Sequence, residues 1–309
     1  MYYTKHMTNN KVLCDASARM AEKDQLECRI LSELFSDSYI NENFVFAGGG
    51  TISKSYRFSP RIGQDIDLAC ADFTEIPDDR SKKRLGNFRK QFKNFVFDVL
   101  RPKINYIINQ DQRFLIVTDR EWRSLINQEQ WLSSPTLHVL YKSAHDAGTH
   151  DVCIEIIPRK YRPSAVSYQS VVPYSTGTPL ASIPTVAYDQ TFWDKIFALH
   201  SNSQTTRPHF DHFYSRHYYD VATLAPMVGL ADTQYMLSDI AQYQARYTTR
   251  GINPAIKPQD IRLLPGDSTL YKLENDYQKM TAETFSGAAE SWDAIVQKLQ
   301  ALNQDLKTL

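Results

Sequence analysis

The sequence lacks the marks of several large protein classes. Its four cysteines, Cys14, Cys28, Cys70 and Cys153, are far apart, and none forms a Cys-x-x-Cys pair. Neither a zinc ribbon nor a redox motif is therefore indicated. The 35 basic and 35 acidic residues cancel, so any nucleic-acid-binding surface must be local. Internal repeats and low-complexity tracts are also missing.

Long apolar runs are absent as well. The N-terminal residues MYYTKHMTNNK contain no signal-peptide core, and no stretch approaches the length of a membrane span. With 42% hydrophobic and 23% charged residues the composition is typical of a globular protein, and we expect it to be cytoplasmic. The 309 residues suffice for one large or two ordinary domains.

Glycine is sparse, with 11 residues, yet three of them are consecutive. The apolar run Phe44–Ala47 leads directly into Gly48–Gly50, and the pair Asp65 and Asp67 follows. Aspartates at i and i+2 on a strand point to one side, where they repel each other unless a cation, commonly a divalent metal, lies between them. A glycine turn offers backbone N–H groups to phosphate oxygens. This combination indicates metal-assisted phosphoryl or nucleotidyl transfer.

Two common nucleotide motifs are excluded. The glycine run fits neither Gly-x-x-x-x-Gly-Lys-[Ser/Thr] nor Gly-x-Gly-x-x-Gly with an acid about 20 residues later. A P-loop and a Rossmann site are both disfavoured.

A metal site of this type usually has a third carboxylate on a neighbouring strand. Asp151, Cys153 and Glu155 share one face of the run 150–157, in which Asp151 lies at the exposed start of the expected strand 152–157. Glu155 lies between apolar residues and needs a partner there, such as a metal or an arginine. We therefore predict Glu155 as the third ligand, with Asp151 as the alternative.

Hydrophobic periodicity predicts the order of elements. Helices are expected over 11–35, 81–100, 191–201, 211–226, 231–246 and 271–306. Strands are expected over 44–47, 66–69, 104–108, 114–117, 136–141 and 152–157. A proline-rich, irregular connection is expected over 161–190. The pattern predicts an α/β (α+β) mixed-sheet domain over 1–185 and a helical domain over 186–309.

The predicted helix 81–100 is amphipathic. Its polar face is basic and is made by Lys82, Lys83, Arg84, Arg89, Lys90 and Lys93. Such a face fits an RNA backbone, and it equally fits an ordinary solvated helix.

Two later segments contain further candidate residues. Lys195 could bind phosphate as a compact charge, although its spacing alone favours a solvated lysine. Asp220 could position or deprotonate an attacking hydroxyl, or it could pair with Arg216 four residues earlier. A zinc site at the nearby histidines is disfavoured, because no cysteine or acid pattern supports it.

Taken together, these segments resemble the abortive-infection nucleotidyltransferase toxins of the AbiEii/AbiGii type, with MenT-like toxins as relatives. The resemblance spans about residues 44–225. The matching blocks are Gly49-Gly50-Thr51, Ser53-Lys54, Arg61 to Leu68, Ile154-Glu155-Ile156, Phe192-Trp193-Asp194-Lys195 to His200, and Arg216-His217-Tyr218-Tyr219-Asp220-Val221. One departure is Ile62-Gly63-Gln64, which replaces the family's Phe-Ser-Glu.

The resemblance implies a DNA polymerase β-like nucleotidyltransferase fold with a helical C-terminal domain. It assigns Mg²⁺ or Mn²⁺ to Asp65, Asp67 and Glu155, and it makes Asp65, Asp67, Lys195 and Asp220 catalytic. The residues that it assigns to nucleotide binding are Gly49, Gly50, Thr51, Lys54, Arg61 and Lys195.

The implied activity is transfer of a nucleotide from an NTP to an RNA, most directly the tRNA 3′ end. The implied setting is a toxin–antitoxin pair in phage defence, with a cognate antitoxin as partner. Two alternatives remain open. One is a protein or small-molecule acceptor, and the other is a non-catalytic NTP-binding module.

Overall fold

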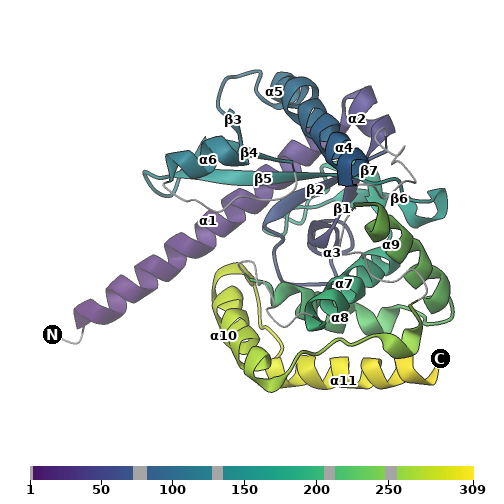
Figure 1. Ribbon diagram of the computed structural model, residues 1–309. Helices are drawn as coiled ribbons and strands as arrows, with labels where there is room; N and C mark the ends of the chain where they lie inside the picture. Colours follow the sequence, from purple (N-terminus) through teal and green to yellow (C-terminus); the bar gives the residue numbers. More distant parts are fainter. Residues whose placement is uncertain (1–2, 72–81, 127–134, 205–212, 248–255) are drawn as a thin grey trace. The chain divides into compact units, whose positions relative to one another are not determined.

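The computed structural model describes residues 3–71, 82–126, 135–204, 213–247 and 256–309 (Figure 1). The chain forms two compact units. Unit 1 comprises Met1–Arg57, Ile62–Thr74 and Arg89–Val186, and unit 2 comprises Phe58–Arg61, Glu75–Phe88 and Ala187–Leu309. The sequence-based division into domains 1–185 and 186–309 stays a prediction.

Unit 1 is built on a mixed seven-stranded sheet in the order β3-β4-β5-β2-β1-β7-β6. The strands are β1 (Phe44–Ala47), β2 (Asp65–Cys70), β3 (Leu115–Thr118), β4 (Thr136–Lys142), β5 (Thr149–Pro158), β6 (Val166–Val171) and β7 (Ala181–Val186). β2 runs parallel to β5 and β1 parallel to β7, whereas the other neighbours are antiparallel. The predicted mixed-sheet fold class is confirmed.

One face of this sheet is covered by helices whose apolar residues form the main core. These core residues come from α1 (Tyr3–Phe35), α2 (Ser38–Asn43), α4 (Lys82–Asn94), the π-helical η1 (Phe95–Leu100) and α5 (Arg101–Ile108). The other helical segments before β7 are α3 (Gly49–Lys54), α6 (Asp119–Leu125) and the 3-10 turn η2 (Pro163–Ala165). Leu31 of α1, Val96 of η1 and Ile104 of α5 are fully buried with Ile66 and Ile154 of the sheet. Burial of this apolar surface is the main force that holds the helices on the sheet.

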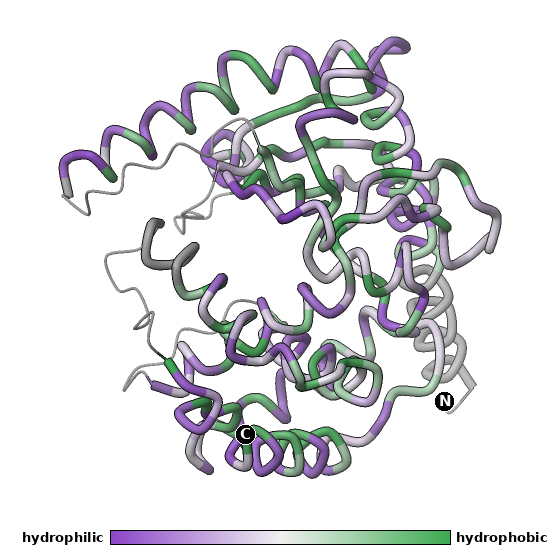
Figure 2. The backbone as a smooth tube through the Cα atoms, turned by 90° about the vertical axis from the view of Figure 1, so that its right-hand side faces the viewer, coloured by the Kyte–Doolittle hydropathy of each residue, from purple (hydrophilic) through white to green (hydrophobic). Residues whose placement is uncertain are grey.

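Unit 2 is helical. It contains α7 (Tyr188–Ser203), α8 (Arg216–Leu224), η3 (Ala225–Met227), α9 (Thr233–Tyr247), η4 (Pro258–Asp260), α10 (Asp267–Thr284) and α11 (Trp292–Thr308). An aromatic cluster joins α8, α10 and α11, with ring centroids 5.0–6.3 Å apart among Tyr218, Tyr219, Tyr277, Phe285 and Trp292. The buried residues of α11 recur at helical spacing and are Trp292, Ile295, Leu299, Leu302 and Leu306. Figure 2 shows hydrophilic and hydrophobic residues alternating along helices of the chain.

Several local predictions were wrong. Residues 104–108 are helical, because Arg101-Pro102 opens a helix whose Ile104 and Ile108 reach the core at i,i+4 spacing. The connection 161–190 contains β6 and β7, and β7 lies beside β1 despite Pro184. The expected helix 271–306 is two helices, since α10 ends at Thr284 and α11 begins at Trp292.

Candidate functional site

The carboxylates of β2 lie on the sheet face opposite the main core. Ile66 and Leu68 belong to that core, so strand alternation places Asp65 and Asp67 on the other face. In the parallel pairing of β2 with β5, Asp67 is opposite Glu155 and Asp65 is opposite Cys153. The neighbouring strand therefore brings Glu155 to the aspartate pair, as the sequence suggested.

Asp151, the alternative third carboxylate, has another partner. Its Oδ2 lies 2.8 Å from Nδ1 of His138, whose Nε2 lies 3.2 Å from Oδ1 of Asp119. Burial acts to raise the pKa of Asp151, but the His138 hydrogen bond and the cations around it lower that pKa. Asp151 is thus part of a separate polar network, and the register favours Glu155.

The donors beside β2 suit a hard divalent cation. Three half-buried carboxylates, those of Asp65, Asp67 and Glu155, supply only oxygen ligands, which Mg²⁺ and Mn²⁺ prefer. Within the described ranges, no three His, Cys, Asp or Glu side chains are already gathered around a common metal position. The backbone placement and the donor chemistry therefore fit a metal, and binding requires these side chains to turn toward it.

The glycine turn meets the second aspartate directly. Gly48 follows β1 with φ of 69°, and a Cβ built on it would lie 1.7 Å from Oδ2 of Asp67. Only glycine fits there, because both the backbone conformation and the space exclude a side chain. The sequence predicted a loop after Gly48, whereas α3 begins at Gly49, so Gly49 and Gly50 lie in a first helical turn. N–H groups of a first turn have no intrahelical acceptor and suit phosphate oxygens.

Thr51 and Lys54, both predicted to contact the triphosphate, are buried in α3. The Thr51 hydroxyl donates to the carbonyl of Gly48 at 2.8 Å. Lys54 Nζ lies 2.8 Å from Asp24 Oδ1, 2.7 Å from Glu27 Oε2 and 3.1 Å from a backbone carbonyl, and the side chain is 1% exposed. The triphosphate role of Lys54 stays a prediction that this geometry disfavours, because its three N–H donors face protein acceptors.

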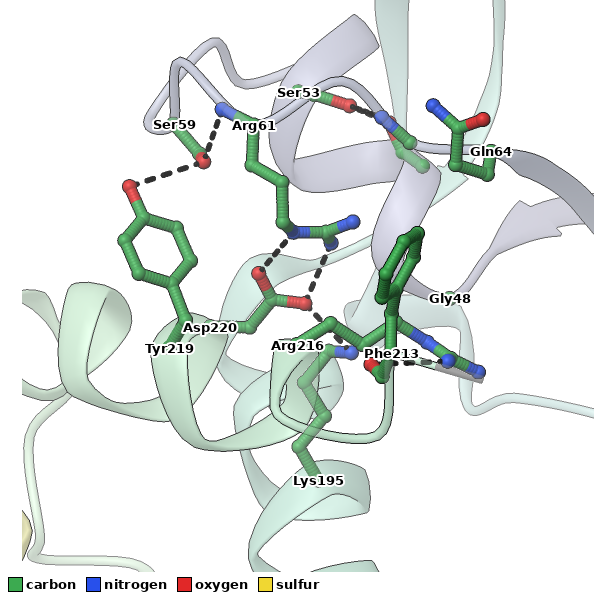
Figure 3. Close-up of polar contacts among 12 residues, drawn as sticks. Gly48, Ser53, Ser59, Arg61, Gln64, Lys195, Phe213, Arg216, Tyr219 and Asp220 are labelled. Atoms are coloured by element: carbon green, nitrogen blue, oxygen red, sulfur yellow. Dashed lines mark hydrogen bonds and ion pairs between the residues drawn. The ribbon is translucent and has the colours of Figure 1, made fainter. Parts of the chain in front are cut away.

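Asp220 is the centre of a buried ion cluster in unit 2 (Figure 3). Arg61 binds both of its oxygens, with Nε–Oδ1 at 3.1 Å and Nη2–Oδ2 at 2.8 Å, and Lys195 Nζ lies 2.9 Å from Oδ2. The side chain of Asp220 is fully buried. Lys195, which spacing alone assigned to a solvated face, is therefore buried and paired.

The electrostatics of this cluster define what Asp220 can do. Burial acts to raise the pKa of Asp220, but Arg61 and Lys195 together lower it. Burial lowers the pKa of Lys195, and Asp220 offsets that effect only in part. An ionised carboxylate held by two cations is a poor general base, so the geometry favours the positioning role of Asp220 over deprotonation. Two cations on one carboxylate leave excess positive charge, which suits a phosphate ligand.

The basic helix is present as predicted. Leu85, Phe88 and Phe92 of α4 are buried, whereas the basic residues face solvent. The exposed set is Lys83, Arg84, Arg89, Lys90 and Lys93. The side chain of Lys82 lies outside the described part.

The match with a family model decides the identity of the chain. The model described as "Nucleotidyl transferase AbiEii toxin, Type IV TA system" matches residues 29–298. The chain belongs to the AbiEii family.

Solved structures agree in length with this AbiEii chain. JHP933 from Helicobacter pylori has 13% sequence identity and a TM-score of 0.46, and the alignment covers 93% of this chain and 92% of that one. A second H. pylori protein, provisionally described as a nucleotidyltransferase, has 13% identity, a TM-score of 0.44 and coverage of 93% and 95%. Comparison with curated proteins gives no match.

Family membership makes this AbiEii chain a nucleotidyltransferase of a type IV toxin–antitoxin system, with a nucleotide as substrate and an antitoxin as partner. Among the described helices, none is long and apolar enough to cross a membrane.

Sequence reasoning missed the partners that hold the predicted residues. The salt bridge between Arg61 and Asp220 joins positions 159 residues apart, and nothing local in the sequence signals it. Asp24 and Glu27 lie in an expected helix among other charged and polar residues, such as Glu22, Lys23 and Arg29, so nothing local marks them as partners of Lys54. Their role depends on Lys54, which lies 30 residues after Asp24 in the chain.

Proposed function

We propose that this AbiEii protein is a divalent-metal-dependent enzyme that transfers a nucleotide from an NTP to the 3′ end of an RNA, with tRNA as the first candidate. The observation that carries this proposal is the register of β2 with β5, which sets Asp65, Asp67 and Glu155 on neighbouring strands beside the glycine turn.

Asp65, Asp67 and Glu155 would hold Mg²⁺ or Mn²⁺. When bound, such an ion neutralises phosphate charge and lowers the pKa of a hydroxyl that it contacts. Gly49 and Gly50 supply backbone N–H donors to phosphate oxygens.

In unit 2, Lys195 is the proposed phosphate ligand. Asp220 holds Lys195 in place and binds Arg61 as well. The reaction forms a bond between the acceptor 3′-oxygen and the α-phosphorus and breaks the bond from that phosphorus to the oxygen that bridges it to the β-phosphate. Pyrophosphate leaves, and the hydroxyl proton passes to solvent. The family resemblance assigns Lys195 to the triphosphate, where its positive charge would favour the leaving pyrophosphate.

An RNA acceptor is supported by the exposed basic residues of α4, a helix that contains no acidic residue between Lys82 and Asn94. Basic side chains on one helix bind phosphates without regard to sequence, and such binding weakens as salt increases. The neutral net charge of the whole chain favours the second candidate, a protein or small-molecule acceptor.

The test is transfer of label to RNA. Purified protein is incubated with Mg²⁺, total tRNA and each α-labelled NTP in turn, beside an Asp65→Asn control. Label on tRNA that is lost in the control supports the proposal and names the nucleotide. Label on protein alone, or nucleotide binding without any transfer, would contradict the RNA acceptor.

A further inference from the structure

The buried charge cluster of Asp24, Glu27 and Lys54 has no role in the reaction described above. Asp24 and Glu27 come from α1, and Lys54 is the last residue of α3. All three side chains are at most 1% exposed, and both ion-pair distances at Lys54 Nζ are below 3 Å. Asp24 also accepts a hydrogen bond at 2.6 Å from the backbone N–H of Tyr174.

A gain in folding stability does not explain why these three charged side chains are buried. Ion pairs that lose their hydration are often no more stabilising than apolar residues of the same size. Burial acts to lower the pKa of Lys54, but Glu27 and Asp24 together raise it, so the ammonium stays charged. Burial raises the pKa of Glu27 despite the two nearby lysines. The cluster is therefore kept at an electrostatic cost, and its contacts indicate what it holds in place.

Lys54 also holds the turn that leads into β2. Its Nζ donates to the carbonyl of Gly63 at 3.1 Å, and the N–H of Gly63 donates to Oγ of Ser53 at 3.2 Å. A Cβ built on Gly63 would lie 3.0 Å from the Cα of Gly50 and 3.2 Å from Ser53 Oγ. The turn thus lies directly against α3, and Asp65 follows only two residues later.

The other end of α3 meets the other aspartate. Gly48, immediately before α3, leaves room for the carboxylate of Asp67, which a Cβ would meet at 1.7 Å. Asp65 and Asp67 are therefore both positioned relative to α3, one through the turn at Gly63 and one through Gly48.

We propose that Lys54, anchored by Asp24 and Glu27 of α1, is a positioning residue. It fixes α3 and the Gly63 turn, and thereby holds Asp65 and Asp67 in place beside the glycine turn. This inference rests on the proposed function for the role of the two aspartates. It also makes Gly63, a departure from the family pattern, part of the close contact with α3, because a Cβ there would lie only 3.0 Å from the Cα of Gly50 and would push the two segments apart.

The experiment compares Lys54→Met and Gly63→Ala with Leu31→Ala, a control that removes core packing from α1 and keeps all three charges of the cluster. Mn²⁺ affinity is measured by electron paramagnetic resonance, nucleotide affinity by calorimetry in EDTA, and kcat and KM by label transfer. Displacing reactive groups by about 1 Å can cost about 100-fold in rate. We expect kcat and Mn²⁺ affinity to fall at least about tenfold in both test variants, with metal-free nucleotide affinity unchanged.

Hydrogen–deuterium exchange supplies a readout that does not depend on activity. We expect faster exchange confined to residues 48–67 in Lys54→Met and Gly63→Ala but not in Leu31→Ala. Loss of nucleotide affinity in EDTA with unchanged Mn²⁺ binding would instead make Lys54 a triphosphate ligand and overturn the proposal. Effects in Leu31→Ala equal to those in the test variants would also overturn it.

Two further results keep the inferences separable. If wild-type protein neither binds Mn²⁺ nor transfers label, the proposed function fails, while the exchange pattern still tests the positioning role. If Lys54→Met does not fold, Glu27→Gln takes its place, since it keeps the shape of the cluster and weakens its hold on Lys54. Unchanged exchange over 48–67 in both Glu27→Gln and Gly63→Ala would refute the positioning role.

Discussion

Replacing Asp220 with asparagine removes the single negative charge from the cluster in unit 2. Arg61 and Lys195 would then be buried with their two positive charges uncompensated, since their side chains are only 4% and 8% exposed. Removing one partner from a buried ion pair costs about 3–5 kcal/mol. We expect Asp220→Asn to lower the free energy of unfolding by an amount in that range, and to abolish nucleotide transfer.

The assay is urea unfolding followed by tryptophan fluorescence, because Trp193 and Trp292 report on the same unit. Lys298→Gln is the matched control, because its ion pair with Glu290 at 2.7 Å is exposed. An exposed pair of this kind contributes about 0.2–1 kcal/mol.

Two comparisons test the reasoning behind this prediction. In the double variant Asp220→Asn with Lys195→Met, the loss of unfolding free energy should be smaller than the sum of the losses in the two single variants, because the two mutated groups share one interaction. A loss below about 1 kcal/mol for Asp220→Asn would refute the inference that the cluster depends on this carboxylate. Since the folded-state pKa of Asp220 is lowered, its contribution is present above the ordinary aspartate pKa and is lost as pH falls through the folded value.

Three further predictions follow from other residues. Gly48→Ala should abolish transfer and reduce the melting temperature measured by calorimetry, because the new Cβ would collide with Asp67 Oδ2; wild-type activity in this variant would contradict the close approach. Lys90→Gln with Lys93→Gln should reduce the slope of log affinity for tRNA against log salt by about 2 in filter binding; an unchanged slope would remove α4 from the RNA surface. Burial, and next the nearby cations, lower the pKa of His217. The neutral His217 therefore stabilises the folded state above pH 6.5, and this contribution is lost as the pH falls further. His217→Gln should reduce the difference in unfolding free energy between pH 7.5 and 5.5 by about 1 kcal/mol, and an unchanged difference would contradict the lowered pKa.

The strand that contains the candidate carboxylates, β2, could be predicted from the sequence, because the information for it is local. The alternation in Asp65-Ile66-Asp67-Leu68 predicts which side of β2 is buried. Glu155, the acid within the apolar run 152–157, indicates the neighbouring strand. The glycine run marks a turn for the same reason, because glycine readily adopts the positive φ of 69° found at Gly48.

The residues that hold the site were not predictable, since they depend on contacts between distant segments. The family resemblance assigned Arg61 to nucleotide binding, and only the fold shows that it binds Asp220 from 159 residues away. Lys54 looked like a phosphate ligand, and only the fold shows that α1 brings two carboxylates to it. The short apolar segment 104–108 fits the hydrophobic pattern of a strand as well as that of a helix. It is helical in α5, where Ile104 and Ile108 are buried in the core.

The most direct test of the central claim compares α-labelled with γ-labelled NTP in one transfer reaction with tRNA and Mg²⁺. Nucleotidyl transfer predicts that only the α-label reaches the RNA while the γ-label leaves as pyrophosphate, and that both signals vanish in Asp67→Asn. Transfer of the γ-label to RNA, or α-label transfer that survives in Asp67→Asn, would contradict the account.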